Sequence, residues 1–255
     1  MQLQDIQNDF QSLTQGLGGD VSISFKVLNT SEEILINEDH EFWAASVIKI
    51  CIAATFFKQL HEGLFNLGDK KVIKQENYVK GSGIAHLLDN SLEYSNLDLL
   101  KLMLILSDNA ATNEIVDLVG WESVEPYMHE LGLKFTTFRH KMQITAGRGP
   151  NITTTKDMLL LLEILHHKKI PGASEILEIM NEEKLRTGIP LYLPNSLRIP
   201  HKTGSLADGF HDVGIVYANK PFIFCFLSDD QLDKNATSKV LAQMSKLCFD
   251  YVSQP

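Results

Sequence analysis

Two kinds of hydrophobic pattern follow one another along this 255-residue chain, and their order limits the folds it can adopt. Apolar side chains alternate over 21–28, a second strand is predicted at 33–37, and further strands are predicted only at 196–202, 213–217 and 222–227. Helical spacing predicts helices at 2–15, 46–60, 96–106, 109–119, 156–167, 174–184 and 233–252. Strands grouped apart from helices indicate an α+β fold and not repeated β-α-β units.

We therefore predict an antiparallel sheet built from both ends of the chain and flanked by the N- and C-terminal helices. Residues 1–44 and 196–255 would form this α/β subdomain, and residues 45–195 a helical subdomain inserted into it. A chain of this length can bury a sizeable core and still shape a deep cleft. We expect the ligand site between the two subdomains, where such clefts commonly form.

Composition narrows the class of partner. The chain has 23 Lys and Arg against 32 Asp and Glu, a formal net charge of −9. This balance argues against binding to nucleic acid or to an anionic membrane surface, because phosphate contact needs a basic patch. The chain has no apolar run of about 18 residues, so no transmembrane helix is predicted. The expected partner is a small molecule, and the expected state is a monomer.

The cysteines and the N-terminal segment both bear on the cellular compartment. Cys51, Cys225 and Cys248 lie far apart in apolar stretches, so we predict buried free thiols and a reducing compartment. Residues 1–20 lack the basic start and apolar core of a secretory signal, which predicts a cytoplasmic protein. A secreted or periplasmic protein whose signal was removed is the alternative. No cluster has metal-ligand spacing, so neither a metal nor another cofactor is expected.

Three short motifs carry candidate chemistry. Ser46-Val47-Ile48-Lys49 puts a hydroxyl and an amine on one face of a predicted helix. There a lysine of lowered pKa could accept the serine proton and activate the hydroxyl as a nucleophile. Ser107-Asp108-Asn109 separates two predicted helices, and Lys202-Thr203-Gly204, followed by Ser205, ends a predicted strand.

Each motif also has an ordinary structural explanation. A capping serine with a surface lysine, a turn with an N-cap, and an edge strand entering a turn would each produce one of them. Average residue usage makes each of the two triplets rare in a chain of this length. Finding all three motifs in this order therefore indicates a shared catalytic site.

This set of motifs resembles the signature of the penicillin-recognising serine enzymes, and most closely that of the class A β-lactamases. The resemblance covers nearly the whole chain and agrees with the predicted order of strands and helices. It implies that Ser46 is the acylated nucleophile and Lys49 its general base. It also implies that Ser107 and Lys202 relay the proton to the leaving group.

The resemblance further implies a set of substrate contacts. Asn109 would contact a substrate amide, Thr203 and Ser205 would hold a substrate carboxylate, and Gly204 permits close backbone approach. The backbone N–H groups of Ser46 and Ser205 would form the oxyanion hole. Arg186 lies in a segment where some members place an arginine facing the carboxylate, and a surface arginine is the alternative.

Two histidines flank the third motif. His201 and His211 could line the cleft, and His211, which is followed by Asp212, could contact the substrate. Both expectations come from position along the chain and not from the resemblance.

The chain departs from the family in one loop. Class A enzymes carry a Glu there, within an E-x-x-L-N motif, that positions the hydrolytic water. The corresponding segment here, residues 139–152, contains no Asp or Glu and offers only His140 or Gln143. A glutamine can orient water but cannot take its proton, whereas a histidine can. This departure affects hydrolysis of the acyl-enzyme and not its formation.

Three functions follow from these observations. The favoured one is a serine hydrolase that opens β-lactam amides through an acyl-enzyme on Ser46. The second is a carboxylesterase or a D-Ala-D-Ala peptidase. The third is a penicillin-binding sensor that is acylated once and releases the acyl group slowly.

Overall fold

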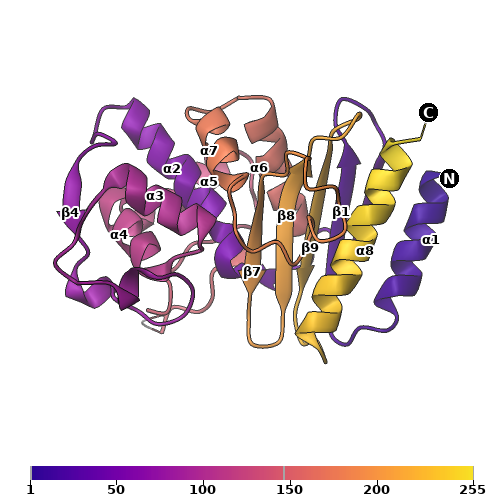
Figure 1. Ribbon diagram of the computed structural model, residues 1–255, viewed down its shortest axis with the longest axis horizontal. Coiled ribbons are helices and arrows are strands. Elements are labelled where there is room, and N and C mark those ends of the chain that lie inside the picture. The colour runs from indigo at the N-terminus through magenta and orange to yellow at the C-terminus, as the bar shows by residue number, and fades with distance from the viewer. Residues whose placement is uncertain (1, 146, 255) are drawn as a thin grey trace.

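The computed structural model describes residues 2–145 and 147–254 (Figure 1). Met1, Ala146 and Pro255, which fall within predicted segments, lie outside the described residues. A five-stranded antiparallel sheet has the order β2-β1-β9-β8-β7. Its strands are β1 (Val21–Val27), β2 (Glu33–Ile36), β7 (His201–Ser205), β8 (Phe210–Val216) and β9 (Phe222–Ser228). The predicted α+β fold, with a sheet built from both ends of the chain, is confirmed.

Helices α1 (Leu3–Thr14) and α8 (Lys234–Val252) cover one face of this sheet (Figure 1). The alternating residues of β1 point to that face because successive strand side chains lie on opposite sides. They join a buried cluster with apolar side chains of both helices, and the rings of Phe10 and Phe224 meet edge to face at 6.1 Å. Burying each such ring contributes about 1.5–3 kcal/mol.

The other face of the sheet packs against α6 (Thr155–His166). Ser22 and Ser24 point to this side, and their hydroxyls lie 2.6 and 3.0 Å from Thr155 Oγ1. Beyond α6 lies the helical half of the molecule, on the left in Figure 1. Its helices are α2 (Lys49–His61), α3 (Asn96–Ile105), α4 (Asn109–Val119), α5 (Trp121–Glu130) and α7 (Ala173–Met180).

One hydrophobic cluster runs from these helices to the inner face of β8 and β9, where it includes Val213 and Cys225. The two predicted subdomains therefore share a core, and their boundaries at residues 45 and 195 stay a prediction. Cys51, Cys225 and Cys248 are all buried and free, as predicted. None of the described helices combines the length and the apolarity that crossing a bilayer requires.

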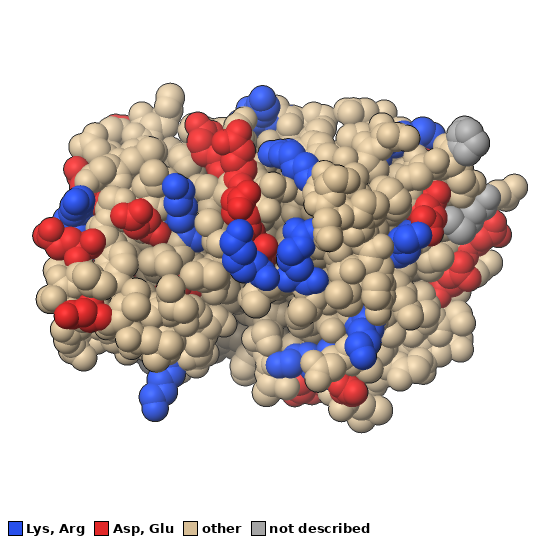
Figure 2. All heavy atoms as spheres, in the orientation of Figure 1, with Lys and Arg blue, Asp and Glu red and all other residues tan. Residues whose placement is uncertain are grey.

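Two short ribbons were not predicted. β3 (Phe42–Trp43) pairs with β6 (Ile152–Thr153), and β4 (Lys70–Val72) pairs with β5 (Glu93–Ser95). The first ribbon ties the segment before Ser46 to the end of the 139–152 loop. On the face shown in Figure 2, Lys and Arg are scattered among Asp and Glu instead of being gathered into one basic surface.

The strand predicted at 196–202 is wrong in its bounds, because β7 begins only at His201. Pro200 has no N–H to donate to a ladder. The carbonyls of Arg198 and Pro200 still accept hydrogen bonds from the backbone N–H groups of Tyr217 and Ile215. Residues 198–200 therefore lie beside the chain of β8 without forming a strand. As a result, the Lys202-Thr203-Gly204 motif lies inside β7 and not at the end of a strand.

Candidate active site

A cavity of about 610 Å³ opens where β7 meets the helical half of the molecule. Of the predicted site residues, Ser46, Asn109 and Ser205 line it. The other lining residues come from the segment before α2, the 81–82 loop, the 140–151 loop and the residue after β7: Trp43, Ala45, Gly81, Ser82, His140, Met142, Gln143, Thr145, Gly147, Gly149, Pro150, Asn151 and Leu206. The cavity therefore draws on widely separated parts of the sequence.

Ser46 lies in a short 3-10 helix, η1 (Ala45–Ile48), that leads into α2. Residues three apart are aligned in such a helix, so Ser46 and Lys49 project from the same side. Ala45 has a left-handed φ of 43°, which is uncommon outside glycine. Among the described residues, the Ser46 hydroxyl has no hydrogen-bond partner. It is therefore free to turn toward a bound substrate.

Gly204 lets the edge strand β7 approach this segment. A Cβ at Gly204 would lie 3.2 Å from the Cβ of Ala45 and 3.1 Å from the Cβ of His211. Both contacts are tighter than ordinary van der Waals packing. The absence of a side chain at Gly204 thus brings Ser205 to the wall of the cavity that Ser46 also lines.

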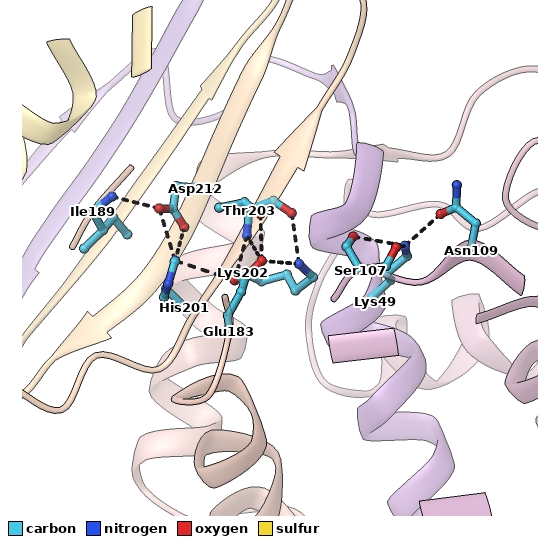
Figure 3. A network of polar contacts seen from close by, with 9 residues as sticks. All are labelled: Lys49, Ser107, Asn109, Glu183, Ile189, His201, Lys202, Thr203 and Asp212. Atoms are coloured by element: carbon cyan, nitrogen blue, oxygen red, sulfur yellow. Dashed lines mark hydrogen bonds and ion pairs between the residues drawn. The ribbon is translucent and has the colours of Figure 1, made fainter. Parts of the chain in front are cut away.

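Lys49 is fully buried beneath the cavity, and its amine has three polar neighbours (Figure 3). Lys49 Nζ lies 2.7 Å from the carbonyl oxygen of Ser107, 2.9 Å from Asn109 Oδ1 and 3.1 Å from Ser107 Oγ. Burial and the charge of Lys202 hold the pKa of Lys49 well below its usual range. In this structure the amine donates toward all three of these oxygens.

Asp108 holds the second motif in place. It caps α4 by accepting a hydrogen bond from Ala111 N at Oδ1, and its Oδ2 accepts two more, each 2.7 Å long, from Ile84 N and Ala85 N. A Cβ at Gly83 would lie 2.2 Å from that Oδ2, and the φ of +100° also requires glycine. Asp108 therefore fixes the loop that borders the cavity.

Lys202 belongs to a buried ionic cluster that lies beside the amine of Lys49 (Figure 3). Its Nζ donates to Glu183 Oε1 at 2.5 Å, and the backbone N–H and hydroxyl of Thr203 also donate to this carboxylate. His201 Nδ1 lies 2.9 Å from Asp212 Oδ1 and 3.6 Å from Glu183 Oε2. Burial lowers the pKa of His201, but the carboxylates of Asp212 and Glu183 together outweigh this effect and the net shift is upward.

The predicted relay between Ser107 and Lys202 has no direct contact in this structure. Among the described residues, Lys202 Nζ donates only to Glu183 and to the carbonyl of Thr203. Its influence on the neighbouring amine is electrostatic, through the lowered pKa of Lys49. Sequence reasoning placed these groups in one site but did not predict which atoms would touch.

His211 does not line the cavity, so the structure gives no support to its prediction as a substrate contact. The ring is fully buried, Nδ1 accepts a hydrogen bond from Ser228 N, and Nε2 lies 2.8 Å from the carbonyl oxygen of Trp43. A carbonyl only accepts, so Nε2 carries the proton and neither nitrogen is left for a ligand. Burial lowers the pKa of His211. The residue ties the chain before Ser46 to β8.

Two other predicted contacts also lie away from the cavity wall. Thr203 is 3% exposed, and its hydroxyl proton goes to Glu183 Oε1 at 2.7 Å. Arg186 is half-buried and does not line the cavity, and it makes no hydrogen bond or ion pair within the described part of the chain. His201, which was expected to line the cleft, is instead buried against Asp212.

The most important residue that sequence reasoning missed is Glu183. The periodicity predicted a helix to residue 184, whereas α7 ends at Met180 and Glu183 lies beyond it. Its neighbour Glu182 is exposed, so the pair looks like the solvated end of a helix. No local pattern separates a buried carboxylate from an exposed one here, because the partner Lys202 is distant in sequence.

Two asparagines hold the 139–152 loop, and they were missed for the same reason. Asn113 donates to the carbonyl of Met142 at 3.1 Å and accepts from its N–H at 2.8 Å. Asn151 Oδ1 accepts from Arg139 N and His140 N, and its amide donates to the carbonyl of His140. The loop is therefore anchored at both ends.

No carboxylate lines the cavity in the described part of the chain. The loop presents His140 and Gln143 there, as expected. His140 Nδ1 lies 2.6 Å from the carbonyl oxygen of Lys141, so the proton of a neutral ring is on Nδ1 and Nε2 is the basic nitrogen. No three His, Cys, Asp or Glu side chains among the described residues are grouped as metal ligands would be.

The fold and the serine–lysine site define a β-lactamase-like serine hydrolase. A sequence profile of the beta-lactamase enzyme family matches residues 4–252, and the chain belongs to that family. A search of curated proteins by sequence found no match.

Solved structures agree with this family. A β-lactamase from Sphaerobacter thermophilus DSM 20745 superimposes with a TM-score of 0.93 at 23% identity, covering 99% of this chain and 98% of that one. A β-lactamase from Chitinophaga pinensis DSM 2588 gives 0.92 at 20% identity, covering 98% and 100%. A mutant of PBP-A, in its acyl-enzyme complex with penicillin G, gives 0.89 at 24% identity, covering 98% and 97%.

Proposed function

We propose that this hydrolase opens β-lactam amides by forming an acyl-enzyme on Ser46. The observation that carries the proposal is a buried lysine of lowered pKa, Lys49, three residues after a serine that lines the cavity and has a free hydroxyl. A serine hydroxyl is a weak nucleophile unless a base takes its proton. Lys49 is the basic group that the local helical geometry places on the same side.

The proposed reaction follows from these contacts. Lys49 Nζ accepts the proton of Ser46 Oγ, and the oxygen attacks the carbonyl carbon of the lactam. The backbone N–H groups of Ser46 and Ser205 stabilise the negative oxygen. The C–N bond then breaks, and the proton passes from Lys49 through Ser107 Oγ, 3.1 Å away, to the leaving nitrogen. Asn109, bonded to Lys49 and lining the cavity, is placed to contact the substrate amide.

An intact-mass time course with excess penicillin tests the nucleophile. The parent protein should gain the mass of the drug, and peptide mapping should place the adduct on Ser46. Ser46→Ala should gain nothing, and it should lose hydrolysis of a chromogenic cephalosporin. A variant that hydrolysed the cephalosporin as fast as the parent would show that another group is the nucleophile.

A second candidate function is a covalent penicillin receptor that deacylates slowly. It is favoured by the absence of a carboxylate from the described cavity lining, since hydrolysis of the acyl ester needs a base near the attacking water. The same time course separates the two functions. An adduct that disappears as the drug is consumed indicates a hydrolase, whereas one that persists after removal of free drug indicates a receptor.

A further inference from the structure

An exposed tryptophan, Trp43, stands in the wall of the active-site cavity. Successive side chains of a strand point to opposite faces, so β3 buries Phe42 and turns Trp43 outward. Trp43 is 59% exposed, and it is the only Trp, Tyr or Phe among the described residues that line the cavity. Ser46 follows it by three residues and lines the same cavity. A large apolar ring is thus open to whatever Ser46 attacks.

The backbone that carries this indole is held on three sides. Trp43 pairs with Ile152 of β6, and its carbonyl oxygen accepts a hydrogen bond of 2.8 Å from Nε2 of the buried His211. The N–H of the next residue, Ala44, donates to the carbonyl of Asn151 at 2.8 Å. Only the two side-chain torsions of Trp43 stay free, so little conformational freedom is lost when a ligand covers the ring.

Contacts within the fold do not account for the exposed indole. Within residues 2–145 and 147–254, the Trp43 ring stacks on no aromatic or cationic side chain, and its N–H has no hydrogen-bond partner. The other tryptophan, Trp121, carries the guanidinium of Arg148 at 4.4 Å from its ring centroid. Leaving the larger part of an indole in water forgoes the stabilisation that burial gives. The Trp43 ring is therefore available to a ligand.

The rest of the cavity lining favours an uncharged, apolar group on that ligand. Pro150 and Leu206, both half-buried, add apolar surface to the cavity. The described lining holds no Asp, Glu, Lys or Arg. A charged substituent would lose hydration there without gaining an ionic partner from the lining. An aromatic ring would instead gain both area burial and the additional attraction of a stacked aromatic pair.

We propose that Trp43 selects substrates whose acyl group carries an aromatic ring, which stacks on the indole. This inference rests on the proposed function, because the acyl group is the part of the substrate that becomes bonded to Ser46. Ser46 and Trp43 line one cavity, so a substituent on the acyl group shares that cavity with the indole. Stacking then favours arylacetyl groups over acetyl groups, whatever the leaving group is.

Acylation rates for two esters with the same leaving group test this selectivity. The p-nitrophenyl esters of phenylacetic and acetic acid differ only in the acyl group, and each rate is divided by the rate of hydrolysis in buffer. The parent should prefer the phenylacetyl ester, and Trp43→Ala should reduce this preference by about tenfold. Trp43→Phe should retain most of the preference. Trp43→Leu, which is apolar but has no ring, should lose most of it.

Tyr192 provides the matched control, since it is 43% exposed but lines a separate groove between α1 and α8. Tyr192→Ala should leave both rates unchanged. The acetyl ester is an internal control for folding, because its rate should be the same in Trp43→Ala and in the parent. Equal slowing of both esters in Trp43→Ala, an unchanged preference in that variant, or a full preference in Trp43→Leu would overturn the proposal.

Equilibrium binding separates this inference from the proposed function. In a Ser46→Ala, Trp121→Phe background, Trp43 is the only tryptophan, and Arg148 still has a ring to cover. Benzylpenicillin, whose acyl side chain ends in a phenyl ring, should change the fluorescence of Trp43. It should also bind about fivefold more tightly than 6-aminopenicillanic acid, which lacks that ring, and calorimetry should show that Trp43→Ala removes the difference.

The two failures give different results. If the binding pattern holds while the parent forms no adduct with either ester or with the penicillin, the acyl-enzyme mechanism fails and the ring site stands. If the parent is acylated but Trp43→Ala changes neither the ester preference nor the binding difference, the ring site fails alone.

Discussion

The two buried lysines of the site have different partners, and this difference sets their chemistry. Lys49 is surrounded by the neutral oxygens of Ser107 and Asn109, whereas Lys202 is bonded to the carboxylate of Glu183. Burial and the charge of Lys202 lower the pKa of Lys49, and the charges of Asp108 and Glu183 raise it. Glu183 therefore affects the base without touching it. The carboxylate both stabilises the cluster and limits how far the pKa of Lys49 falls.

Glu183→Gln should consequently move the pH dependence of acylation. Acylation requires neutral Lys49, so the rate falls as the pH drops through the pKa of that amine. Removing the negative charge lowers this pKa further, and the acid limb of the rate profile should shift to lower pH. Leaving Lys202 buried without its partner should also reduce the free energy of unfolding by about 3–5 kcal/mol.

Stopped-flow acylation rates across pH and urea denaturation measure the two effects of Glu183→Gln. Glu182→Gln is the matched control, since the neighbouring side chain is exposed and should change neither. An acid limb that stayed in place in Glu183→Gln, with stability reduced, would assign Glu183 a structural role only.

At the scale of elements, the short loop over residues 81–85 depends on Asp108. The carboxylate joins the start of α4 to the backbone of Ile84 and Ala85, and Asn109 N donates to the carbonyl of Ser82. This clamp keeps the loop at the border of the cavity. Because the loop has little apolar burial of its own near Gly81 and Ser82, hydrogen bonds supply most of its order.

Asp108→Asn should loosen this loop. The amide keeps one acceptor oxygen but cannot serve all three N–H groups, and each one left unsatisfied costs about 1–3 kcal/mol. We expect a lower urea midpoint, and faster hydrogen exchange at residues 82–85 in the native state. The exposed Asp89, whose carboxylate accepts from the backbone N–H and the hydroxyl of Ser91, gives the control Asp89→Asn. Unchanged exchange in Asp108→Asn would show that packing, and not the carboxylate, orders the loop.

Elements long enough for their hydrophobic pattern to repeat several times were predictable from the sequence, and short elements were not. The helices predicted at 2–15 and 109–119 and the strand at 21–28 agree with α1, α4 and β1 within a residue or two. The two-residue strands β3 and β6 are too short to show a period, and α5 contains Pro126, which obscures its pattern.

The motifs located Ser46, Lys49 and Asn109. Glu183 belongs to the site only through contacts distant in sequence, and one chain's sequence carries no local signal for it.

At the scale of the whole molecule, buried histidines join the sheet to the rest of the structure. His211 connects β8 to the segment before Ser46, and His201 lies between Asp212 and Glu183. Their pKa values shift in opposite directions, because His201 has a carboxylate partner and His211 has only burial and backbone partners. The stability of the fold should therefore depend on pH on both sides of the ordinary histidine pKa of 6.5.

His201 should make the protein less stable in alkali. Its folded pKa lies above 6.5, so its stabilisation is complete below that pH and is lost as the pH rises through the folded pKa. His211 has a lowered pKa, so its contribution to the pH dependence of stability lies below pH 6.5 and does not overlap that of His201. The melting temperature of the parent should fall as the pH rises above about 6.5. The melting temperature of His201→Asn, which keeps a donor for Asp212, should fall less over this range. Equal falls of the parent and variant melting temperatures in scanning calorimetry would assign the effect to other groups.

The pairing of β1 with β9 also sets the order in which the molecule can be built during synthesis. Val27 lies opposite Phe222, so the central pair of the sheet joins segments from the beginning and the end of the chain. A nascent chain that leaves the ribosome can form its helices early. Strand β1 can pair with β9 only after residues 222–228 have emerged. Such a high contact order slows folding. The active site, whose β7 wall is held by β8 and β9, is therefore among the last parts of the protein to assemble.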